Sequence, residues 1–409
     1  MIARDLDRPL TLAHARDARS GSSPVSGDGP RHGIRRLVLT DFRNYARAVV
    51  EPRRACVVLT GDNGAGKTNL LEAVSLLGPG RGLRGAPFAE ISRHGAEGGW
   101  AVAARLAGPG GDSDIGTGLA GTDADGQATR QVKVDGTMLR GSGGLGDHVR
   151  VVWLTPAMDR LFTGPAGDRR RFLDRLVVAF DPAHGTRVNS FEKAMRERNR
   201  LLDRPGADPV WLDGVETQMA ENGVAIAAAR RDAVACLGAI LDERRAVAPD
   251  SPFPWMTLAL DGLLEGLLDG APAVEAEDRY RRILREARGR DAAAGRTLDG
   301  PHRTDILVEH GPKAAPAREC STGEQKALLV GMVLAHARVI QGTFDGYPPI
   351  LLLDEIAAHL DAGRRQALFA ELAGLGAQVW MTGTEVALFA ELGDRACFNT
   401  VVDGRVTPS

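Results

Sequence analysis

The chain has 409 residues, of which 43% are hydrophobic and 25% charged, the composition of an ordinary folded protein large enough for two or three domains. It contains no run of about eighteen apolar residues and no basic segment followed by an apolar stretch at its start, and its four cysteines are widely scattered, so we expect a cytoplasmic protein without a membrane span or a disulfide framework. The formal net charge of −2 excludes nucleic-acid binding through the overall charge, and any DNA contact must use a local basic patch.

The N-terminal part of the sequence predicts a tail followed by the start of an α/β domain. Residues 1–32 are rich in Gly, Ser, Pro, Asp and Arg without periodicity, which predicts a flexible tail. A strand is expected at 34–40, and a second at 56–60 runs into a glycine-rich loop followed by a helix over 67–77. Apolar patterning predicts further strands at 100–106, 131–134 and 149–154, while the Gly- and Asp-rich stretch 108–126 is expected to be a loop.

The rest of the chain is first helical and then returns to strand–helix alternation. Helical spacing predicts helices at 169–180, 188–202, 212–247 and 274–288. Alternation resumes with strand 305–308, helix 323–340, strand 350–353, helix 362–373 and strand 378–382. We therefore expect an ATPase lobe made of 33–180 and 301–409, interrupted by a smaller helical lobe over 181–300.

The glycine-rich loop carries the first chemical motif. Its residues fit G-x-x-x-x-G-K-[ST] in the strand–loop–helix context that a P-loop requires: Gly61, Asp62, Asn63, Gly64, Ala65, Gly66, Lys67 and Thr68. In such a loop the backbone N–H groups cradle phosphates, Lys67 lies between the β- and γ-phosphates, and the Thr68 hydroxyl ligates Mg²⁺. A chance match in a chain with 50 glycines is the alternative, but the scarcity of lysine makes it rare.

A second phosphate-handling signal lies far along the chain. Four apolar residues from Ile350 end in Asp354 and Glu355, the pattern of a buried strand whose tip reaches a nucleotide. Asp354 would hold Mg²⁺ and Glu355 would act as general base for the attacking water. We expect this strand to lie beside the P-loop strand, so that a large segment is inserted between them. The spacing therefore predicts an ATPase head whose two halves lie far apart in the sequence and come together in the fold.

A third motif precedes the acidic strand. The segment from Cys320 to Lys326 is similar to the signature loop of ABC-type ATPases, with Ser321, Gly323 and Gln325 at the start of a helix. An ordinary helix cap is the alternative interpretation. In the ABC superfamily this loop contacts the γ-phosphate held by the opposite subunit, which implies a catalytic role for Ser321 and ATP-dependent dimerisation. Asp361 is either the N-cap of the next helix or a contact across that dimer.

Several further segments narrow the resemblance to one family. They are Leu37–Tyr45, the P-loop with its flank through Asn69 to Ala73, Arg170–Asp174, Glu197–Leu202 and above all Gly300–Asp305. Together with the signature they occur in the order typical of the RecF family, from residue 33 to about 385. The N-terminal motif of that family implies that Arg43 and Asn44 lie near the nucleotide, and the flank adds Asn69.

The resemblance implies both a fold and a function. The fold is an SMC-like, ABC-type ATPase head with a small helical lobe and no long coiled coil. The function is ATP-dependent homodimerisation on DNA, at gaps or single-strand/double-strand junctions, and work with RecR and RecO to load RecA during recombinational repair. ATP hydrolysis is expected to be weak and DNA-stimulated, so that it times release.

Some assignments stay open at this point. DNA contacts could come from Arg81, Arg84, Arg169, Arg170 and Arg171. The run from Arg169 to Arg171 fits a solvated helix face or an intramolecular ion-pair network slightly better. The glutamine that senses Mg²⁺ could be Gln127 or Gln131. No histidine stands at the switch position of ABC heads, where Thr382 and Thr384 are the candidates. His302 and Arg303 could form a nucleotide contact or a contact between the lobes, or the segment could be a structural turn after Gly300 and Pro301.

Three other functions compete with this interpretation. A transporter's ATP-binding subunit predicts a switch histidine and a signature nearer the P-loop. An SMC-like tether needs a much longer heptad-repeat insert than residues 168–300 provide. A binding protein with a degenerate site is disfavoured by the intact Lys67, Asp354 and Glu355.

Overall fold

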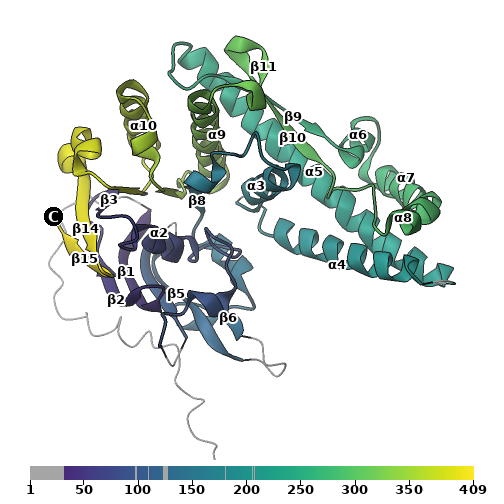
Figure 1. Cartoon of the computed structure of the whole chain (residues 1–409), viewed down its shortest axis with the longest axis horizontal. Coiled ribbons are helices and arrows are strands. Elements are labelled where there is room, and N and C mark those ends of the chain that lie inside the picture. Colours follow the sequence, from purple (N-terminus) through teal and green to yellow (C-terminus); the bar gives the residue numbers. More distant parts are fainter. Residues whose placement is uncertain are drawn as a thin grey trace, which may run out of the picture. The chain divides into compact units, whose positions relative to one another are not determined.

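The computed structural model describes residues 32–96, 99–108, 110–122, 128–179, 181–204, 206 and 208–409. The chain divides into two compact units (Figure 1). The first contains the described residues up to Ala157 together with Ile340–Ser409, and the second is Met158–Val339. The predicted tail lies outside the described residues except for His32, which is buried against the rings of Phe344 and Tyr347 and so belongs to the fold.

An antiparallel sheet forms one part of the first unit. Its order is β2-β1-β4-β5-β6-β7, with bounds Tyr45–Val50, Gly33–Phe42, Ala101–Gly108, Gly111–Thr122, Ala128–Val134 and Thr137–Met138. The expectation of a loop over 108–126 was wrong for most of that stretch, because β5 pairs with β4 on one side and β6 on the other. Backbone pairing between two neighbours overrides the low strand propensity of glycine and aspartate.

A second sheet carries the phosphate-handling motifs. Its order is β15-β14-β3-β13-β12-β8, and all neighbours are parallel except β14 and β15. The bounds are Arg405–Pro408, Ala396–Val402, Cys56–Thr60, Val379–Gly383, Ile350–Leu353 and Val151–Leu154. Strands β3 and β12 were expected to be neighbours, and this was wrong: β13 lies between them and pairs with both.

The helices of the first unit surround these sheets. Helix α2 (Lys67–Ser75) contacts β1, β8 and β13 and so touches strands of both sheets. Arg130 of β6 binds the chain just after α2, because its guanidinium donates to the carbonyls of Leu76, Gly78 and Gly80 and to the Thr117 hydroxyl. Burial lowers the pKa of Arg130 to about 10. The remaining elements are α10 (Ala362–Leu375) and five 3₁₀ segments, Phe88–Ile91, Ser142–Asp147, Pro156–Met158 at the boundary of the unit, Ile356–His359 and Val386–Arg395.

The second unit is mainly helical. Its helices are α3 (Ala166–Val178), α4 (His184–Leu202), α5 (Pro209–Val247), α6 (Leu263–Gly270), α7 (Ala273–Glu286), α8 (Arg288–Ala294) and most of α9 (Thr322–Thr343). A small sheet, β11-β10-β9, has bounds Ala315–Pro316, Asp305–His310 and Met256–Asp261, and the 3₁₀ segments Gly311–Lys313 and Ala317–Glu319 flank β11. The unit extends beyond the predicted 181–300 on both sides, because α3 packs on α4, α5 and β10.

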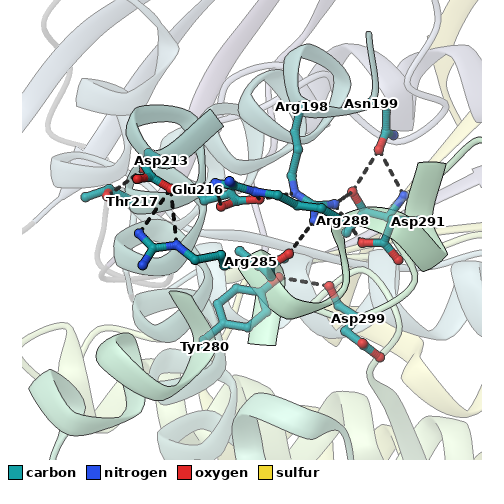
Figure 2. A network of polar contacts seen from close by, with 12 residues as sticks. Arg198, Asn199, Asp213, Glu216, Thr217, Tyr280, Arg285, Arg288, Asp291 and Asp299 are labelled. Atoms are coloured by element: carbon teal, nitrogen blue, oxygen red, sulfur yellow. Dashed lines mark hydrogen bonds and ion pairs between the residues drawn. The ribbon is translucent and has the colours of Figure 1, made fainter. Parts of the chain in front are cut away.

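A buried polar network stabilises the second unit (Figure 2). Arg198 is 0% exposed and bonds Glu216 at 2.9 Å, Asp291 at 2.7 Å, the Thr297 hydroxyl and the Leu284 carbonyl. Such a guanidinium is stable in the interior only because its donors are satisfied and its charge is paired. The family-like segment Glu197–Leu202 therefore supplies a core residue of this unit.

The Gly300–Asp305 segment forms a structural turn against the same core. Gly300 has φ +142°, and a Cβ there would lie 2.3 Å from the Tyr280 hydroxyl oxygen. His302 stacks on Phe191, and burial lowers the pKa of its imidazole. Gly300 and His302 are therefore packed as expected for the structural turn.

Stability of the second unit is expected to depend on pH through His336 of α9. This imidazole is buried, bonds the Leu176 carbonyl at 2.9 Å, and has its pKa lowered to about 4 because burial disfavours the cation. The unfolded chain binds this proton near pH 6.5 and the folded chain only near pH 4, so stability is present above pH 6.5 and falls as the pH drops between these values. We expect a loss on the order of 2 kcal/mol by pH 4.5.

Urea denaturation at several pH values tests this, with His336→Gln against His94→Gln at an exposed site. The first variant should show a flatter pH dependence than the wild type. Parallel curves for all three proteins would contradict the assignment.

Candidate nucleotide site

The loop between β3 and α2 admits only glycine at its two ends. Gly61 has φ +144°, and a Cβ there would lie 2.2 Å from the Val401 carbonyl oxygen. Gly66 has φ +118°, and its Cβ would lie 2.5 Å from the Asn44 amide nitrogen and 2.7 Å from the Tyr45 hydroxyl. Because both conformations are left-handed and both spaces are filled, any side chain would distort the loop. The loop is therefore held in the curled form that can receive phosphates.

Lys67 places its ammonium inside this curl. The side chain is buried, and Nζ donates to the carbonyl oxygens of Gly61 at 2.7 Å and Asp62 at 2.9 Å. The helix that begins at Lys67 directs its N-terminus, with unpaired N–H groups, at the same place. A lysine, a helix N-terminus and a glycine loop together form a site for a polyphosphate.

Thr68 and the acidic strand end meet at the edge of the parallel sheet. The Thr68 hydroxyl lies 2.9 and 3.1 Å from the two carboxylate oxygens of Asp354. The two residues meet although β13 separates β3, which precedes the P-loop, from β12, which precedes Asp354. The Thr382 hydroxyl at the end of β13 donates to Asp354 at 2.8 Å and accepts the Glu355 N–H at 2.9 Å. A hydroxyl beside a carboxylate is the oxygen donor set that Mg²⁺ prefers, so these residues fit that ion.

Glu355 follows with a strained backbone. Its φ of +53° is left-handed, which is uncommon for glutamate and occurs most often at functional sites. The side chain is half-buried, whereas Asp354 is buried. The Asp354 carboxylate is thus held by two hydroxyl groups, and the Glu355 carboxylate remains accessible for proton transfer.

The predicted nucleotide residues before and after the loop form a connected network. Asn44 donates to the Ala65 carbonyl at 2.9 Å and accepts from Asn69 at 2.8 Å. Arg43 binds both carboxylate oxygens of Glu72, at 2.8 and 2.6 Å, and also the Glu90 carbonyl. Tyr45 donates to the Gly66 carbonyl at 3.0 Å. The structure thus brings these residues together around the loop.

Glu72 is the central residue that sequence reasoning missed. It is 1% exposed and also accepts from Arg84 at 2.6 Å, so that two arginines share one buried carboxylate. The sequence could have indicated this residue, because Glu72 lies on the apolar face of the predicted helix, where a charged side chain needs a partner. Thr382 and Thr384 were candidates for a phosphate contact. In the structure Thr382 donates a hydrogen bond to Asp354, and Thr384 is exposed.

Most of the arginines proposed as DNA contacts already have an intramolecular partner. Arg84 is bound to Glu72 and Asn69, Arg170 donates to the Thr304 carbonyl at 3.1 Å, and Arg171 pairs with Asp168. Arg169 forms a two-point ion pair with Asp305 at 2.8 and 2.7 Å. For the run 169–171 these contacts agree with the ion-pair alternative. Arg81 is exposed, and its guanidinium lies 5.7 Å from the centroid of the Phe88 ring.

The signature segment lies in the second unit at the start of α9. Ser321 donates through its hydroxyl and N–H to Glu324, at 2.9 and 3.0 Å, which is a capping box. Gln325 donates to the Cys320 carbonyl at 2.8 Å, and Gly323 is exposed. Both the cap and an exposed serine at a helix N-terminus are therefore present.

Two further predicted residues have defined places, and one does not. Asp361 is the N-cap of α10, accepting from the Arg364 N–H at 2.8 Å, while its side chain stays exposed. Gln131 lies on β6 of the antiparallel sheet. Gln127 lies outside the described residues. Of the described helices, none is long and apolar enough to cross a membrane.

Comparisons with known proteins agree on one family name. No protein-family model matches the chain. The chain is 57% identical over 377 residues to the DNA replication and repair protein RecF of Mesorhizobium japonicum, covering 92% of this chain and 98% of the relative. It is 54% identical over 374 residues to the protein of the same name in Rhizobium meliloti, covering 91% and 98%.

Solved structures show the fold. One described as the recombination mediator protein RecF-ATP in the RecFOR pathway superposes with a TM-score of 0.78 at 21% identity, covering 94% of this chain and 99% of that one. An Smc head bound to the C-terminal winged-helix domain of ScpA gives a TM-score of 0.51 at 16% identity, covering 92% and 96%. The fold is therefore that of an SMC-like, ABC-type ATPase head, as expected from the motifs.

Proposed function

The chain belongs to the RecF family of DNA replication and repair proteins, and from this membership we propose that it is an ATP-dependent DNA-binding protein of recombinational repair and replication restart. The observation that carries the proposal is the meeting of Thr68, Asp354 and Thr382 beside the curled P-loop. It unites residues from three distant parts of the sequence into one Mg²⁺- and phosphate-binding arrangement. The resemblance to a structure described as RecF-ATP supports the same nucleotide.

The proposed roles follow from the geometry of each residue. The loop from Gly61 to Thr68 holds the phosphates, and Lys67 neutralises them. Asn44 and Asn69 brace the loop from outside, and Arg43 binds Glu72 of the helix that follows it. Thr68 and Asp354 hold Mg²⁺, which when bound offsets charge on the phosphates. Glu355 accepts a proton from the attacking water. Hydrolysis is weak and DNA-stimulated, and serves as a switch.

Dimerisation and DNA binding complete the proposal. Ser321 and Gly323 reach the nucleotide of a second copy, Gln325 holds their loop through the Cys320 carbonyl, and Asp361 contacts that copy. ATP therefore joins two heads, and the dimer binds gapped or single-strand/double-strand junction DNA with Arg81 among its phosphate contacts. RecR and RecO act with it to promote RecA loading in the cytoplasm. The assignment of Arg84, Arg170 and Arg171 to DNA is weaker, because each already has an intramolecular partner.

Loss of the Thr382 hydroxyl is expected to weaken Mg²⁺ binding without unfolding the protein. Thr382→Val removes the donor to Asp354 and the acceptor for the Glu355 N–H but keeps the shape. Residues that orient a metal ligand typically contribute about 10- to 100-fold in metal affinity. A Mg²⁺ titration of ATP binding measures the change, with Thr384→Val as control. Equal Mg²⁺ requirements in the two variants would refute the role.

Binding to gapped duplex DNA tests the function. We expect fluorescence anisotropy to show tight binding with Mg-ATP and at least about tenfold weaker binding with Mg-ADP, which is a modest coupling free energy. Lys67→Arg should behave as the wild type does with ADP. Fully duplex DNA and a salt series separate gap recognition from charge attraction. Affinity that ignores the nucleotide would contradict an ATP-gated protein.

A further inference from the structure

A partly buried ion pair lies next to the signature loop, with its lysine buried and its aspartate partly exposed. Lys326, in the first turns of α9, is 7% exposed, and its Nζ lies 2.9 and 3.0 Å from the two carboxylate oxygens of Asp159. Asp159 follows the 3₁₀ segment Pro156–Met158 and is partly exposed. Both residues belong to the second unit. The pair connects the signature helix to a segment that is far from it in sequence.

The position of this lysine is electrostatically unfavourable unless it has a partner. The N-terminus of a helix carries partial positive charge, so a buried cation there is repelled by the helix and also loses its hydration. Asp159 offsets both effects. Lys326 is one of few lysines in an arginine-rich chain, and its compact ammonium meets both carboxylate oxygens. The start of α9 is therefore held by a specific contact in addition to ordinary packing.

The start of α9 has one buried face that is hydrogen-bonded to the rest of the unit and one exposed face. Gln325 anchors the Cys320 carbonyl and Lys326 anchors Asp159, both on the buried side. Ser321 and Gly323 lie on the exposed side. The Gln325 N–H donates to the Ser321 carbonyl at 2.9 Å, so the contacts that hold Gln325 and Lys326 also hold the backbone of Ser321.

We propose that Asp159 is a positioning residue that, through Lys326, aims the signature serine at the nucleotide of a second copy. The inference rests on the proposed ATP-dependent dimer and adds a residue that the sequence motifs do not contain. Asp159 is assigned no contact with ATP itself. Its loss should therefore affect dimerisation while leaving nucleotide binding by the monomer intact.

The test compares ATP affinity with ATP-dependent dimerisation in the full-length protein. For Asp159→Asn we expect unchanged ATP affinity by equilibrium binding, and a dimer dissociation constant in Mg-ATP raised about tenfold, the size typical of a residue that carries coupling. Asp269→Asn is the matched control, because it breaks another ion pair of the same unit, with Arg231 at 2.8 Å. Asp159→Glu and the exchanged pair Asp159→Lys with Lys326→Asp should restore most of the dimerisation.

The outcomes separate this inference from the proposed function. If the wild type does not dimerise in Mg-ATP, the proposed function fails. If the wild type dimerises and Asp159→Asn dimerises equally well, only the positioning role fails. Loss of ATP affinity together with dimerisation, or failure of the exchanged pair to restore a folded variant, identifies a purely structural ion pair and overturns the inference.

Discussion

Glu355→Gln is expected to abolish ATP hydrolysis while preserving, and prolonging, the ATP-bound dimer. The substitution removes the proton acceptor but keeps the size of the side chain, and the backbone N–H bond to Thr382 is unaffected. General-base catalysis typically contributes about 10²- to 10⁴-fold to a rate, and we expect a loss in that range. Single-turnover phosphate release measures the rate, and light scattering measures how long the dimer on gapped DNA persists.

The control for this experiment is Glu385→Gln. Glu385 is an exposed glutamate just beyond β13, so its neutralisation changes the local charge equally without touching Asp354 or Thr382. It should hydrolyse ATP at the wild-type rate. Hydrolysis by Glu355→Gln at the rate of this control would mean that another group accepts the proton.

Arg198→Met is expected to destabilise the second unit by about 3–5 kcal/mol, the usual effect of removing one member of a buried ion network. Asp291 would lose its 2.7 Å partner while remaining 1% exposed, and the Leu284 carbonyl would lose its donor (Figure 2). Glu216 is affected less, because Arg288 still binds it. Thermal unfolding followed by circular dichroism should show a melting temperature lower by roughly 10 °C.

Arg196→Met provides the comparison on the same helix. Arg196 forms an exposed ion pair with Glu192 at 3.6 Å, a type of contact that contributes at most about 0.5 kcal/mol. The two variants delete the same chemical group from α4. Similar melting temperatures for both would show that the network around Arg198 does not stabilise the unit.

The sequence predicts the chemistry of this site better than its topology. Strand Ile350–Leu353 and the P-loop helix were predicted because an unbroken apolar run and a glycine-rich motif are strong local signals. The insertion of β13 between β3 and β12 was not, since neighbour order in a parallel sheet depends on long connections that leave no local pattern. The strand β5 was missed because its glycine- and aspartate-rich composition resembles a loop.

Residues that act through other residues were the hardest to predict. Glu72 joins arginines from two segments, Thr382 joins Asp354 to the Glu355 backbone, and Arg130 binds carbonyls just after α2. Glu72 lies in the P-loop flank and Thr382 was a candidate for the switch position, but no spacing pattern indicates these contacts. Such positions become visible only when burial shows that a charge or hydroxyl must have a partner.

The most direct measurement of the central claim is the molar mass of the wild-type protein by multi-angle light scattering in Mg-ATP and in Mg-ADP. An ATP sandwich built from the P-loop of one copy and Ser321 of another predicts a dimer in Mg-ATP and a monomer in Mg-ADP. It also predicts that Lys67→Arg and Ser321→Arg stay monomeric in both. The same mass in both nucleotides, for all three proteins, would contradict an ATP-gated dimer.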